Sequence, residues 1–288
     1  MISTVIGHRR LSVLFLAGLA ASGCAVQPTN PTFRVDVDTA KSRIKEMQRS
    51  PRALSRPLLI LNGWFDPGVT TAHLQGVFGR AFDRHRIVSL SFTFTGTFDR
   101  CREKVIKAVD EAFPTSDAVW TTEVDMLAVS MGALVARYAA AESLGRRRLR
   151  IARLFTIAAP HRGAPSAEIP TLDPLLHDMR AGSPFLRTLD AALPSCGYPI
   201  IPYVRLGDSL VGPENAAPPG QVPRWLPNRP FDLAHVGVAA DPRILADIML
   251  RLRGEKPFST DPPAPLPAPG EEEVDDRKTP PHTKDPKP

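Results

Sequence analysis

The chain has 288 residues, of which 43% are hydrophobic and 23% are charged, and it carries a formal net charge of +6. This size and apolar content are enough to bury one large core, which excludes a fully disordered chain and favours a single globular domain with irregular ends. The basic and aromatic residues do not interleave and no nucleic-acid-binding motif is present, so we do not expect a nucleic-acid partner.

Residues 1–23 are typical of an export signal peptide. The basic stretch HRR precedes the apolar run LSVLFLAGLA, which is too short to cross a bilayer as a mature helix. The small residues before Cys24 in ASGC resemble a bacterial lipoprotein cleavage site, although Ala21 stands where leucine is usual. We therefore expect a lipidated Cys24 at the new N-terminus, with simple secretion and an uncleaved signal anchor as alternatives.

A lipid on Cys24 would anchor the protein outside the cytoplasm, since each buried CH₂ of an acyl chain contributes about 0.8 kcal/mol to membrane binding. We expect it in the cell envelope of a bacterium, on the outer membrane and facing the periplasm. Residues 24–56 would then be a tether and an N-terminal appendage. Within it, FRVDV at Phe33–Val37 alternates like a strand, and Asp38 is positioned to cap a helix through Gln48.

The segment 57–254 alternates between buried strands and helices. The apolar runs RPLLILNGW, RIVSLSF, VDMLAVS and RIARLFTIAAP are typical of strands that are covered on both faces. Helices of about 12 to 16 residues follow the second and third runs, the first of them at Phe98–Phe113. Such alternation predicts an α/β fold with a doubly wound, mostly parallel sheet.

The alternation stops at residues 161–195, where prolines, glycines and short apolar clusters predict a cap or lid insertion. Its apolar residues suit an acyl chain or a lipid surface, or else pack the insertion onto the domain. YPIIPYVRLGD then resumes the sheet, and Asp241 and Pro242 begin a last helix that ends at Gly254. Residues 255–288 are Pro-rich and charged, which predicts a disordered tail.

The charge and the cysteines each leave two interpretations. The positive charge suits an anionic membrane or substrate, but much of it comes from GRRRLR at 145–150, which is also typical of a solvated loop. Cys101 and Cys196 could pair in an oxidising compartment. Cys101 also fits the apolar face of a helix, where it would be a buried free thiol. No pattern indicates a metal or a cofactor, and none fixes the oligomeric state.

Ser130 is the candidate nucleophile. The pentapeptide AVSMG, Ala128–Gly132, departs from the pattern G-x-S-x-G only in its first residue. An apolar strand ends directly before Ser130 and a helix begins directly after it. This motif needs that context, because a strained turn must lift the hydroxyl above the sheet. Without that turn, Ser130 would be an ordinary small residue between a strand and a helix.

Acyl transfer also needs two backbone N–H groups that bind the developing negative charge, and removing one such donor costs about 2.7 to 4 kcal/mol. We expect the first from Met131, the residue after the serine. The second would come from Trp64 in the loop LNGWFDPG, where Gly63 permits an unusual backbone angle. The alternative for this loop is a plain turn at the end of a strand.

An acid and a base should follow the serine along the chain. His235 lies just before the last helix, where the base is expected; a surface or core histidine is the alternative. Asp208, at the end of a predicted strand, is the expected acid, or else a turn aspartate. The weaker candidates are His161, as a structural or substrate-facing residue, His177, on the lid surface, and Asp232 and Asp173, as substitute acids.

Together these motifs resemble the lipase and esterase branch of the α/β-hydrolase superfamily. The stretches that carry the resemblance lie within residues 57–253 and are AVSMG, Asn62-Gly63-Trp64, TIAAPHRGAPSAEI, DMRAGSPFL, VRLGDSLVGPENA and AHVGVAADPRIL. The resemblance implies hydrolysis of a carboxylic ester through an acyl-enzyme. It also implies a catalytic triad formed by Ser130, Asp208 and His235. The oxyanion hole would be formed by Trp64 and Met131.

A lipid-anchored serine ester hydrolase acting on an ester or lipid substrate is the favoured function, because nucleophile, acid and base are all present. Two alternatives stay open on the sequence. One is a catalytically silent hydrolase-fold envelope lipoprotein that binds a partner. The other is an acyltransferase that passes the acyl group from the same serine to an alcohol or an amine. No motif encodes the physiological ester or the length of its acyl chain.

Overall fold

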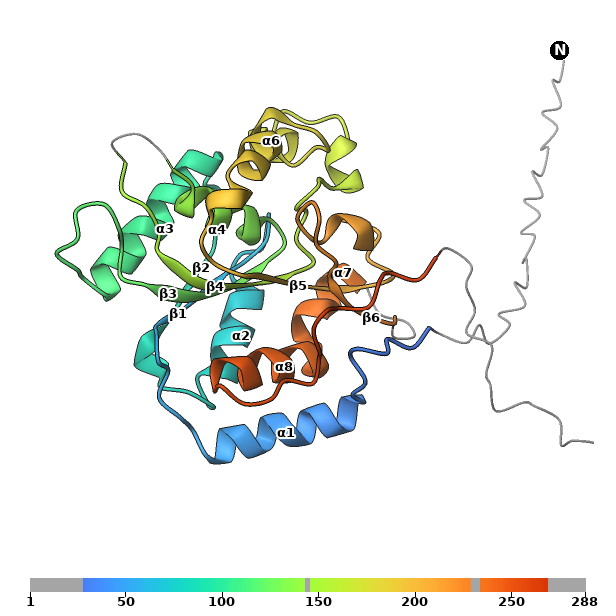
Figure 1. Ribbon diagram of the computed structural model, residues 1–288. Helices are drawn as coiled ribbons and strands as arrows, with labels where there is room; N and C mark the ends of the chain where they lie inside the picture. The colour runs from blue at the N-terminus through green and yellow to red at the C-terminus, as the bar shows by residue number, and fades with distance from the viewer. Residues whose placement is uncertain (1–27, 143–145, 229–233, 269–288) are drawn as a thin grey trace, which may run out of the picture.

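The structure is a computed structural model that describes residues 28–142, 146–228 and 234–268 (Figure 1). The expected signal peptide, the expected lipidation site Cys24 and the segment 269–288 lie outside the described residues. None of the described helices is both long enough and apolar enough to cross a membrane.

Six parallel strands form one sheet in the order β2-β1-β3-β4-β5-β6. The strands are β1 (Leu58–Leu61), β2 (Ile87–Leu90), β3 (Val124–Val129), β4 (Ile151–Ile157), β5 (Ile200–Arg205) and β6 (Arg224–Leu226). The first five correspond to the apolar runs of the sequence, whereas β6 was not predicted. With three residues, β6 is too short to produce a recognisable pattern.

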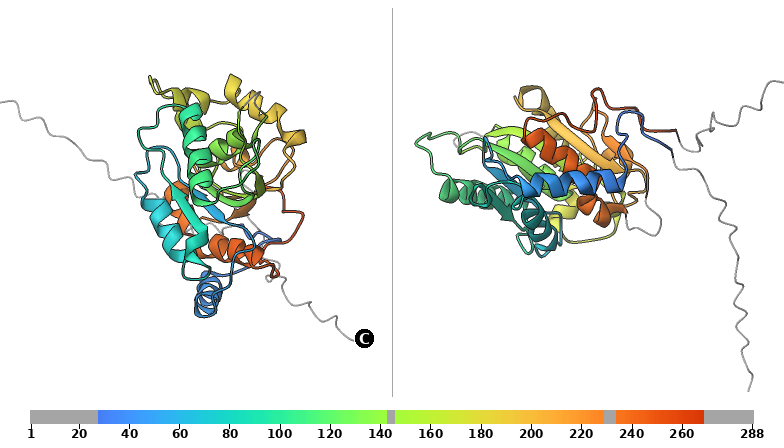
Figure 2. Two further views of the ribbon diagram at one scale, coloured as in Figure 1. Left: turned by 90° about the vertical axis from the view of Figure 1, so that its left-hand side faces the viewer. Right: turned by 90° about the horizontal axis from the view of Figure 1, so that it is seen from below.

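Helices cover both faces of the sheet, as a doubly wound fold requires (Figure 1). The helices α3 (Phe98–Ala112) and α4 (Met131–Ala140) lie on one face, and α2 (Val69–Phe78) and α8 (Pro242–Leu252) lie on the other. The N-terminal helix α1 (Val37–Arg49) packs against α8 as an outer element, as the view from below shows (Figure 2).

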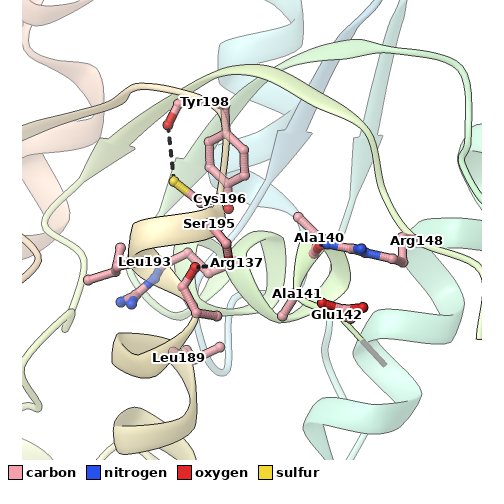
Figure 3. Close-up of a pocket in the computed structure, with 11 residues that line it drawn as sticks. Arg137, Ala140, Ala141, Glu142, Arg148, Leu189, Leu193, Ser195, Cys196 and Tyr198 are labelled. Atoms are coloured by element: carbon pink, nitrogen blue, oxygen red, sulfur yellow. Dashed lines mark hydrogen bonds between the residues drawn. The ribbon is translucent and has the colours of Figure 1, made fainter. Parts of the chain in front are cut away.

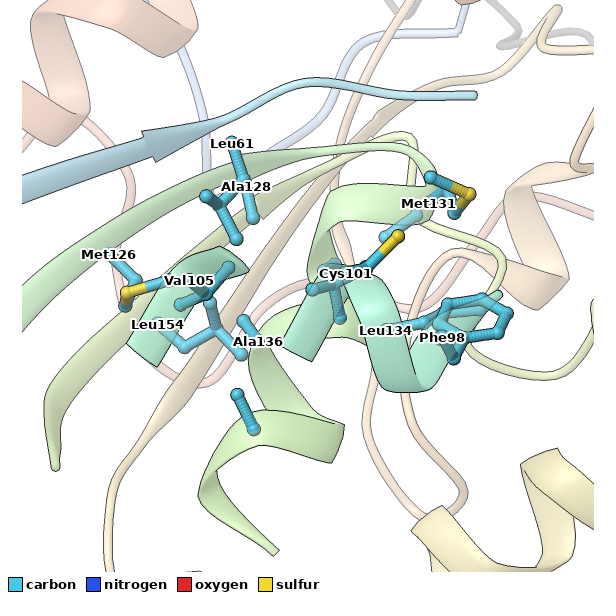
Figure 4. Packing of buried hydrophobic residues seen from close by; sticks show 14 of the residues in the cluster. Leu61, Phe98, Cys101, Val105, Met126, Ala128, Met131, Leu134, Ala136 and Leu154 are labelled. Carbon is cyan, nitrogen blue, oxygen red and sulfur yellow. The ribbon is translucent and has the colours of Figure 1, made fainter. Parts of the chain in front are cut away.

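Each face of the sheet has its own apolar core. Along β1, Leu59 and Leu61 face the α3 and α4 side, while Leu58 and Ile60 face the α2 and α8 side. Figure 4 shows the first of these cores, where strand residues meet the side chains of α3 and α4. Burial on both faces explains why the strands are continuously apolar instead of alternating.

The N-terminal appendage differs from its prediction in two details. Helix α1 begins at Val37, because the Asp36 carboxylate accepts hydrogen bonds from the backbone N–H groups of Asp38 and Thr39, at 2.9 and 2.7 Å. Asp38 therefore lies in the first turn and is not the cap. The strand expected at Phe33–Val37 does not form. Phe33 is instead buried, with its ring 6.3 Å from that of Tyr203.

The C-terminal segment 255–268 packs onto the domain and is not part of a disordered tail. The Ser259 N–H donates to the buried Asp247 carboxylate at 2.6 Å, and the Trp225 indole N–H donates to the Pro265 carbonyl at 2.9 Å. These side chains satisfy backbone groups of a Pro-rich segment that forms neither helix nor strand. Composition alone could not reveal them, because they come from β6 and α8.

The predicted insertion at 161–195 forms a small helical cap beside α4 (Figure 1). Its elements are η2 (Pro165–Glu168), α5 (Pro174–Asp178), α6 (Pro184–Ala191) and η3 (Leu193–Ser195). Arg137 of α4 pairs with Asp190 of α6 at 2.9 Å, and Phe185 stacks on Phe98 of α3 at 4.0 Å. Most apolar residues of the cap are buried, so they serve to attach it to the domain; they are Leu175, Leu176, Met179, Leu186 and Leu189.

Candidate active site

Ser130 occupies a strained turn between β3 and α4. Its φ and ψ are 51° and −126°, a conformation that costs a residue with a side chain about 1 to 3 kcal/mol. The Ser130 N–H still donates to the Ile157 carbonyl of β4 at 2.8 Å, and its carbonyl accepts from Ala133 at 3.1 Å. The Ser130 hydroxyl does not cap α4, and the residue is partly exposed. The turn therefore presents this hydroxyl at the end of the strand.

Gly132 explains why α4 can start so close to the sheet. A Cβ atom at this position would lie 2.5 Å from the Asn62 carbonyl oxygen and 2.9 Å from the Leu61 Cβ, so only glycine fits. Ala128, where the motif has glycine, is fully buried, and its methyl group belongs to the core beside Leu61 (Figure 4). The departure from the motif is thus accommodated in the core and leaves the turn intact.

The loop after β1 passes directly over the serine. A Cβ atom on Gly63 would lie 3.0 Å from the Ser130 Cβ and 3.5 Å from its Oγ, so a side chain there would crowd the hydroxyl. The buried Asn62 amide fixes the loop, since its Oδ1 accepts from the Phe92 N–H at 3.2 Å. Trp64 follows Gly63 directly, which places its backbone beside the hydroxyl.

Met131 is the first residue of α4, and its side chain is fully buried. The first N–H groups of a helix have no acceptor within the helix, and the helix dipole makes that end electropositive. The backbone of Met131 is therefore suited to meet a negative charge that develops next to Ser130.

Asp208 and His235 form a hydrogen-bonded pair. The His235 Nδ1 lies 2.9 Å from Asp208 Oδ2 and 3.1 Å from Oδ1. Asp208 follows β5 and is 2% exposed, and its Oδ1 also accepts from the N–H groups of Leu210 and Val211, each at 3.1 Å. His235 belongs to the short helix α7 (Ala234–Gly237). Because a carboxylate accepts from Nδ1–H, the other ring nitrogen, Nε2, is the one able to take up a proton.

The topology gathers these groups at one edge of the sheet. Trp64 follows β1, Ser130 follows β3 and Asp208 follows β5, and the carboxyl ends of parallel strands share an edge. The strand order reverses at β1: the next strand in the chain, β2, lies on one side of β1, and β3 to β6 lie on the other. Ligands of open α/β sheets bind outside the carboxyl ends at such a switch point. The structure thus joins Ser130 to the Gly63 loop and Asp208 to His235, with β4 between the two pairs.

The other two histidines after the serine that the structure describes have different surroundings. His161 is completely buried, with Nδ1 at 3.2 Å from an Arg137 nitrogen and Nε2 at 3.2 Å from the Thr156 hydroxyl. Burial, helped by the charges of Arg137 and Arg162, lowers the pKa of His161 well below its usual value. It is a neutral structural residue. His177 is exposed on the cap.

Asp173 is engaged with the loop after β1. Its Oδ1 caps α5 by accepting from Leu175 N–H at 2.9 Å, and its Oδ2 accepts from the Trp64 indole N–H at 2.7 Å. Sequence reasoning missed this link, because the two residues are 109 positions apart. Asp173 therefore does not hold His235. Asp232, the other substitute acid, lies outside the described residues.

Both described cysteines are free thiols. Burial raises the pKa of Cys101 to about 12, so it is not a thiolate near neutral pH. Cys196 donates to the Tyr198 carbonyl at 3.3 Å beside a cavity of about 20 Å³, which has room for about one water molecule (Figure 3). This cavity is too small for an ester.

Among the residues that the structure describes, no group of three acidic, histidine or cysteine side chains could hold a metal ion.

Several solved structures match part of this chain at low identity and with TM-scores below 0.5. The phospholipase PlaB from Legionella pneumophila is 16% identical, with a TM-score of 0.42 over 54% of this chain and 38% of the phospholipase, so this chain spans well under half of its length. The lipase BlEst2 from Bacillus licheniformis is 11% identical, with a TM-score of 0.44 over 71% of this chain and 92% of the lipase. The carboxylesterase Cest-2923 from Lactobacillus plantarum is 13% identical, with a TM-score of 0.43 over 72% of this chain and 88% of the carboxylesterase.

No family model matches the chain, and no curated protein matches it either. The fold itself is defined by its own features: a parallel sheet with the order β2-β1-β3-β4-β5-β6, helices on both faces, and a serine turn between β3 and α4. It is an α/β fold with a doubly wound parallel sheet and a cap insertion, and the predicted fold class is confirmed.

Proposed function

We propose that the protein is a serine hydrolase that cleaves carboxylic esters through an acyl-enzyme. Ser130 would be the nucleophile, His235 the general base and Asp208 the carboxylate that holds the base. The observation that carries this proposal is the strained turn at Ser130, on the same sheet edge as the Asp208–His235 pair. Strained backbone conformations are concentrated at functional sites. A serine that only linked a strand to a helix would not require a strained conformation.

In the first half of the reaction, Ser130 Oγ attacks the ester carbonyl carbon while His235 Nε2 takes the hydroxyl proton. The tetrahedral intermediate then expels the alcohol, which receives that proton from the imidazolium. In the second half, water attacks the acyl-enzyme, and His235 again takes and returns one proton. The acid product leaves and Ser130 regains its hydroxyl, so no cofactor is required.

The Asp208 carboxylate would act through the imidazole. Its hydrogen bond to Nδ1 favours the tautomer in which Nε2 can accept a proton, and it would stabilise the imidazolium that forms. Two backbone N–H groups hold the carboxylate itself in place. Its burial strengthens the interaction with the charged ring, because water does not screen it.

The backbone N–H groups of Trp64 and Met131 would form the oxyanion hole. Gly63 brings the first close to the serine, and the start of α4 supplies the second. Each donor of this kind is worth about 2.7 to 4 kcal/mol of transition-state stabilisation.

We further propose that Cys24 is lipidated and anchors the enzyme in the cell envelope, at the outer membrane and facing the periplasm. The sequence ASGC at the end of the export signal supports this. Mass spectrometry of the mature protein tests it: an acylated Cys24 is expected, and an unmodified one would contradict the proposal.

Replacement of the nucleophile tests the proposed chemistry. With chromogenic esters of short and long acyl chains, Ser130→Ala should lower kcat at least about a thousandfold, because the acyl-enzyme cannot form. Ser50→Ala, at an exposed serine after α1, should retain full activity. Equal turnover by Ser130→Ala and the parent would remove Ser130 as the nucleophile. Acyl transfer instead of hydrolysis would appear as a new ester when an acceptor alcohol is added.

A further inference from the structure

Large apolar side chains that are exposed gather at the edge of the sheet that carries the candidate site. Among the described residues nine are exposed, and seven of them follow the carboxyl ends of strands. We call these seven the apolar rim: Trp64, Phe65 and Val69 after β1, Phe94 after β2, Ile169 and Leu172 after β4, and Leu210 after β5. The other two, Val119 and Val222, precede β3 and β6 and so lie at the opposite edge.

The loops that bear the rim are tied together on the β1 side. The rings of Trp64 and Phe65 are 5.3 Å apart, and the Trp64 indole is hydrogen-bonded to Asp173, the neighbour of Leu172. The loop that carries Phe94 joins them, because the Thr93 hydroxyl and the Ser91 hydroxyl both donate to the Asp66 carbonyl, at 2.7 and 2.8 Å.

The loops on the β5 side are tied in the same way. The Ser166 hydroxyl and its N–H both donate to the Leu210 carbonyl, at 2.8 and 3.2 Å. The Arg180 guanidinium donates to the Ile169 carbonyl at 3.0 Å. The rim therefore consists of apolar side chains on anchored loops, at the same edge of the sheet where Ser130 is presented.

Two members of the rim are held in a backbone conformation that is unfavourable for bulky residues. Phe65 has a φ of 56° and is 70% exposed, and Phe94 has a φ of 61° and is 95% exposed. Glycine or asparagine would adopt this conformation at lower cost. In water, most of each phenyl ring has no apolar contact, although Phe65 lies beside Trp64. An apolar phase outside the protein would supply the missing contact.

Two acids next to the rim, Asp66 and Asp173, are already hydrogen-bonded. Asp66 Oδ1 accepts from the N–H groups of Gly68 and Val69, at 2.8 and 2.9 Å, and the Asp173 carboxylate accepts from Trp64 and α5. Polar groups that keep their partners are less costly to bring into an apolar boundary. The rim can therefore approach such a boundary without leaving these charges unpaired.

We propose that the apolar rim inserts into the surface of a phospholipid bilayer, so that the site receives an ester directly from the lipid. A bilayer fits better than a protein partner because the side chains stand on separate loops, and each can enter the acyl region without a matching face. The described chain starts only four residues after Cys24, a span of at most about 14 Å, so an anchored domain would lie at the membrane. This inference rests on the proposed function.

Vesicle binding tests the rim independently of catalysis. The protein is the mature chain, residues 24–288, with Cys24→Ser to remove the anchor and Ser130→Ala to prevent turnover. Co-sedimentation with phosphatidylcholine vesicles is measured for this parent, for Phe94→Asn combined with Leu172→Asn, and for Val119→Asn as the matched control. Both rim side chains are more than 90% exposed, with values of 95% and 98%, so their replacement does not disturb the core.

We expect the parent to bind, the double rim variant to bind at least tenfold more weakly, and Val119→Asn to bind like the parent. Raising the salt concentration from 0.1 to 0.5 M should not weaken binding, since apolar insertion is not screened by ions. Equal binding by the rim variant and the parent would overturn the proposal. So would the absence of binding by the parent, or binding that salt abolishes. Hydrolysis of a soluble short-chain ester, assayed with Ser130 restored, reports the proposed chemistry separately.

Discussion

Two buried aspartates of this protein differ in the partners they hold. Asp208 is 2% exposed and pairs with His235, whose side chain keeps 18% of its surface exposed. Asp241 is completely buried between Arg205 and Arg243, whose guanidinium nitrogens both lie 2.7 Å from the same carboxylate oxygen. An imidazole gains and loses a proton near neutral pH, whereas a guanidinium does not. The first pair is suited to proton transfer and the second to holding a fixed charge.

The Asp208–His235 pair and the Asp241–arginine cluster also lie in different parts of the fold. Asp208 follows β5 at the edge that also carries Ser130, whereas Asp241 caps α8 by accepting from the Arg243 N–H at 3.0 Å. Burial alone would raise the pKa of Asp241, but the hydrogen bonds and charges of Arg243 and Arg205 hold it below its ordinary value. Two carboxylates with similar burial thus have separate duties, one proposed in catalysis and one in stability.

The largest expected effect is on catalysis at Asp208. Asp208→Asn should lower kcat on a soluble ester by about four orders of magnitude, because the amide favours the wrong tautomer of His235. Thermal unfolding should change little, since the side-chain oxygen of the introduced asparagine can still accept from the backbone. A loss of activity below tenfold would show that this carboxylate does not serve the base.

The second effect, on stability, is expected at Asp241. Asp241→Asn should lower the free energy of unfolding by about 3 to 5 kcal/mol, because two buried guanidinium groups each lose a charged hydrogen-bond partner. Urea unfolding measures this, with the exposed Asp38→Asn as the control. The activity of each folded molecule should stay unchanged. A variant as stable as the parent would contradict the structural role.

A smaller effect is expected at a third aspartate, Asp173, which links the cap to the loop over the serine. Trp64→Phe keeps an aromatic ring, although a smaller one, and removes the indole N–H that donates to Asp173; it should lower kcat by about tenfold, equivalent to about 1.4 kcal/mol. Adding Asp173→Ala should then have little further effect on kcat, because the two residues act as one pair. Trp120→Phe, away from this edge, is the control. Additive losses would show that the hydrogen bond does not position the loop.

The smallest effect is the acid dependence of stability. Because the folded pKa of Asp241 is depressed, its contribution is fully present above the ordinary value of 3.8 and is lost as the pH falls below it towards the folded pKa. The free energy of unfolding of the parent should therefore decline more steeply in that range than that of Asp241→Asn. Parallel declines would indicate that other carboxylates account for acid sensitivity.

Much of the fold could be predicted because its strands are buried on both faces. Continuous apolar runs located β1 to β5, whereas β6 has only three residues. Helix α2 was not predicted, since VTTAHLQGVF contains threonines and a glycine, which are weak helix formers. At α1, Asp36 and Asp38 can both cap a helix, and the pattern of the sequence does not distinguish between them.

The candidate site could be proposed in part because its residues follow strands in a fixed order. Ser130 has a local motif, and the structure pairs Asp208 with His235 although 27 positions separate them. The contact of Gly63 with Ser130 and the hydrogen bond between Trp64 and Asp173 could not be predicted. Both depend on how loops from different strands meet in space, and no local pattern records that.

Covalent labelling tests the central claim most directly. The protein is treated with an organophosphate that reacts with activated serines, and the site of the adduct is determined by mass spectrometry. A single adduct on Ser130 is expected, with labelling strongly slowed in His235→Ala, because the hydroxyl then lacks its base. An unlabelled Ser130, or equally fast labelling in the parent and in His235→Ala, would contradict the account.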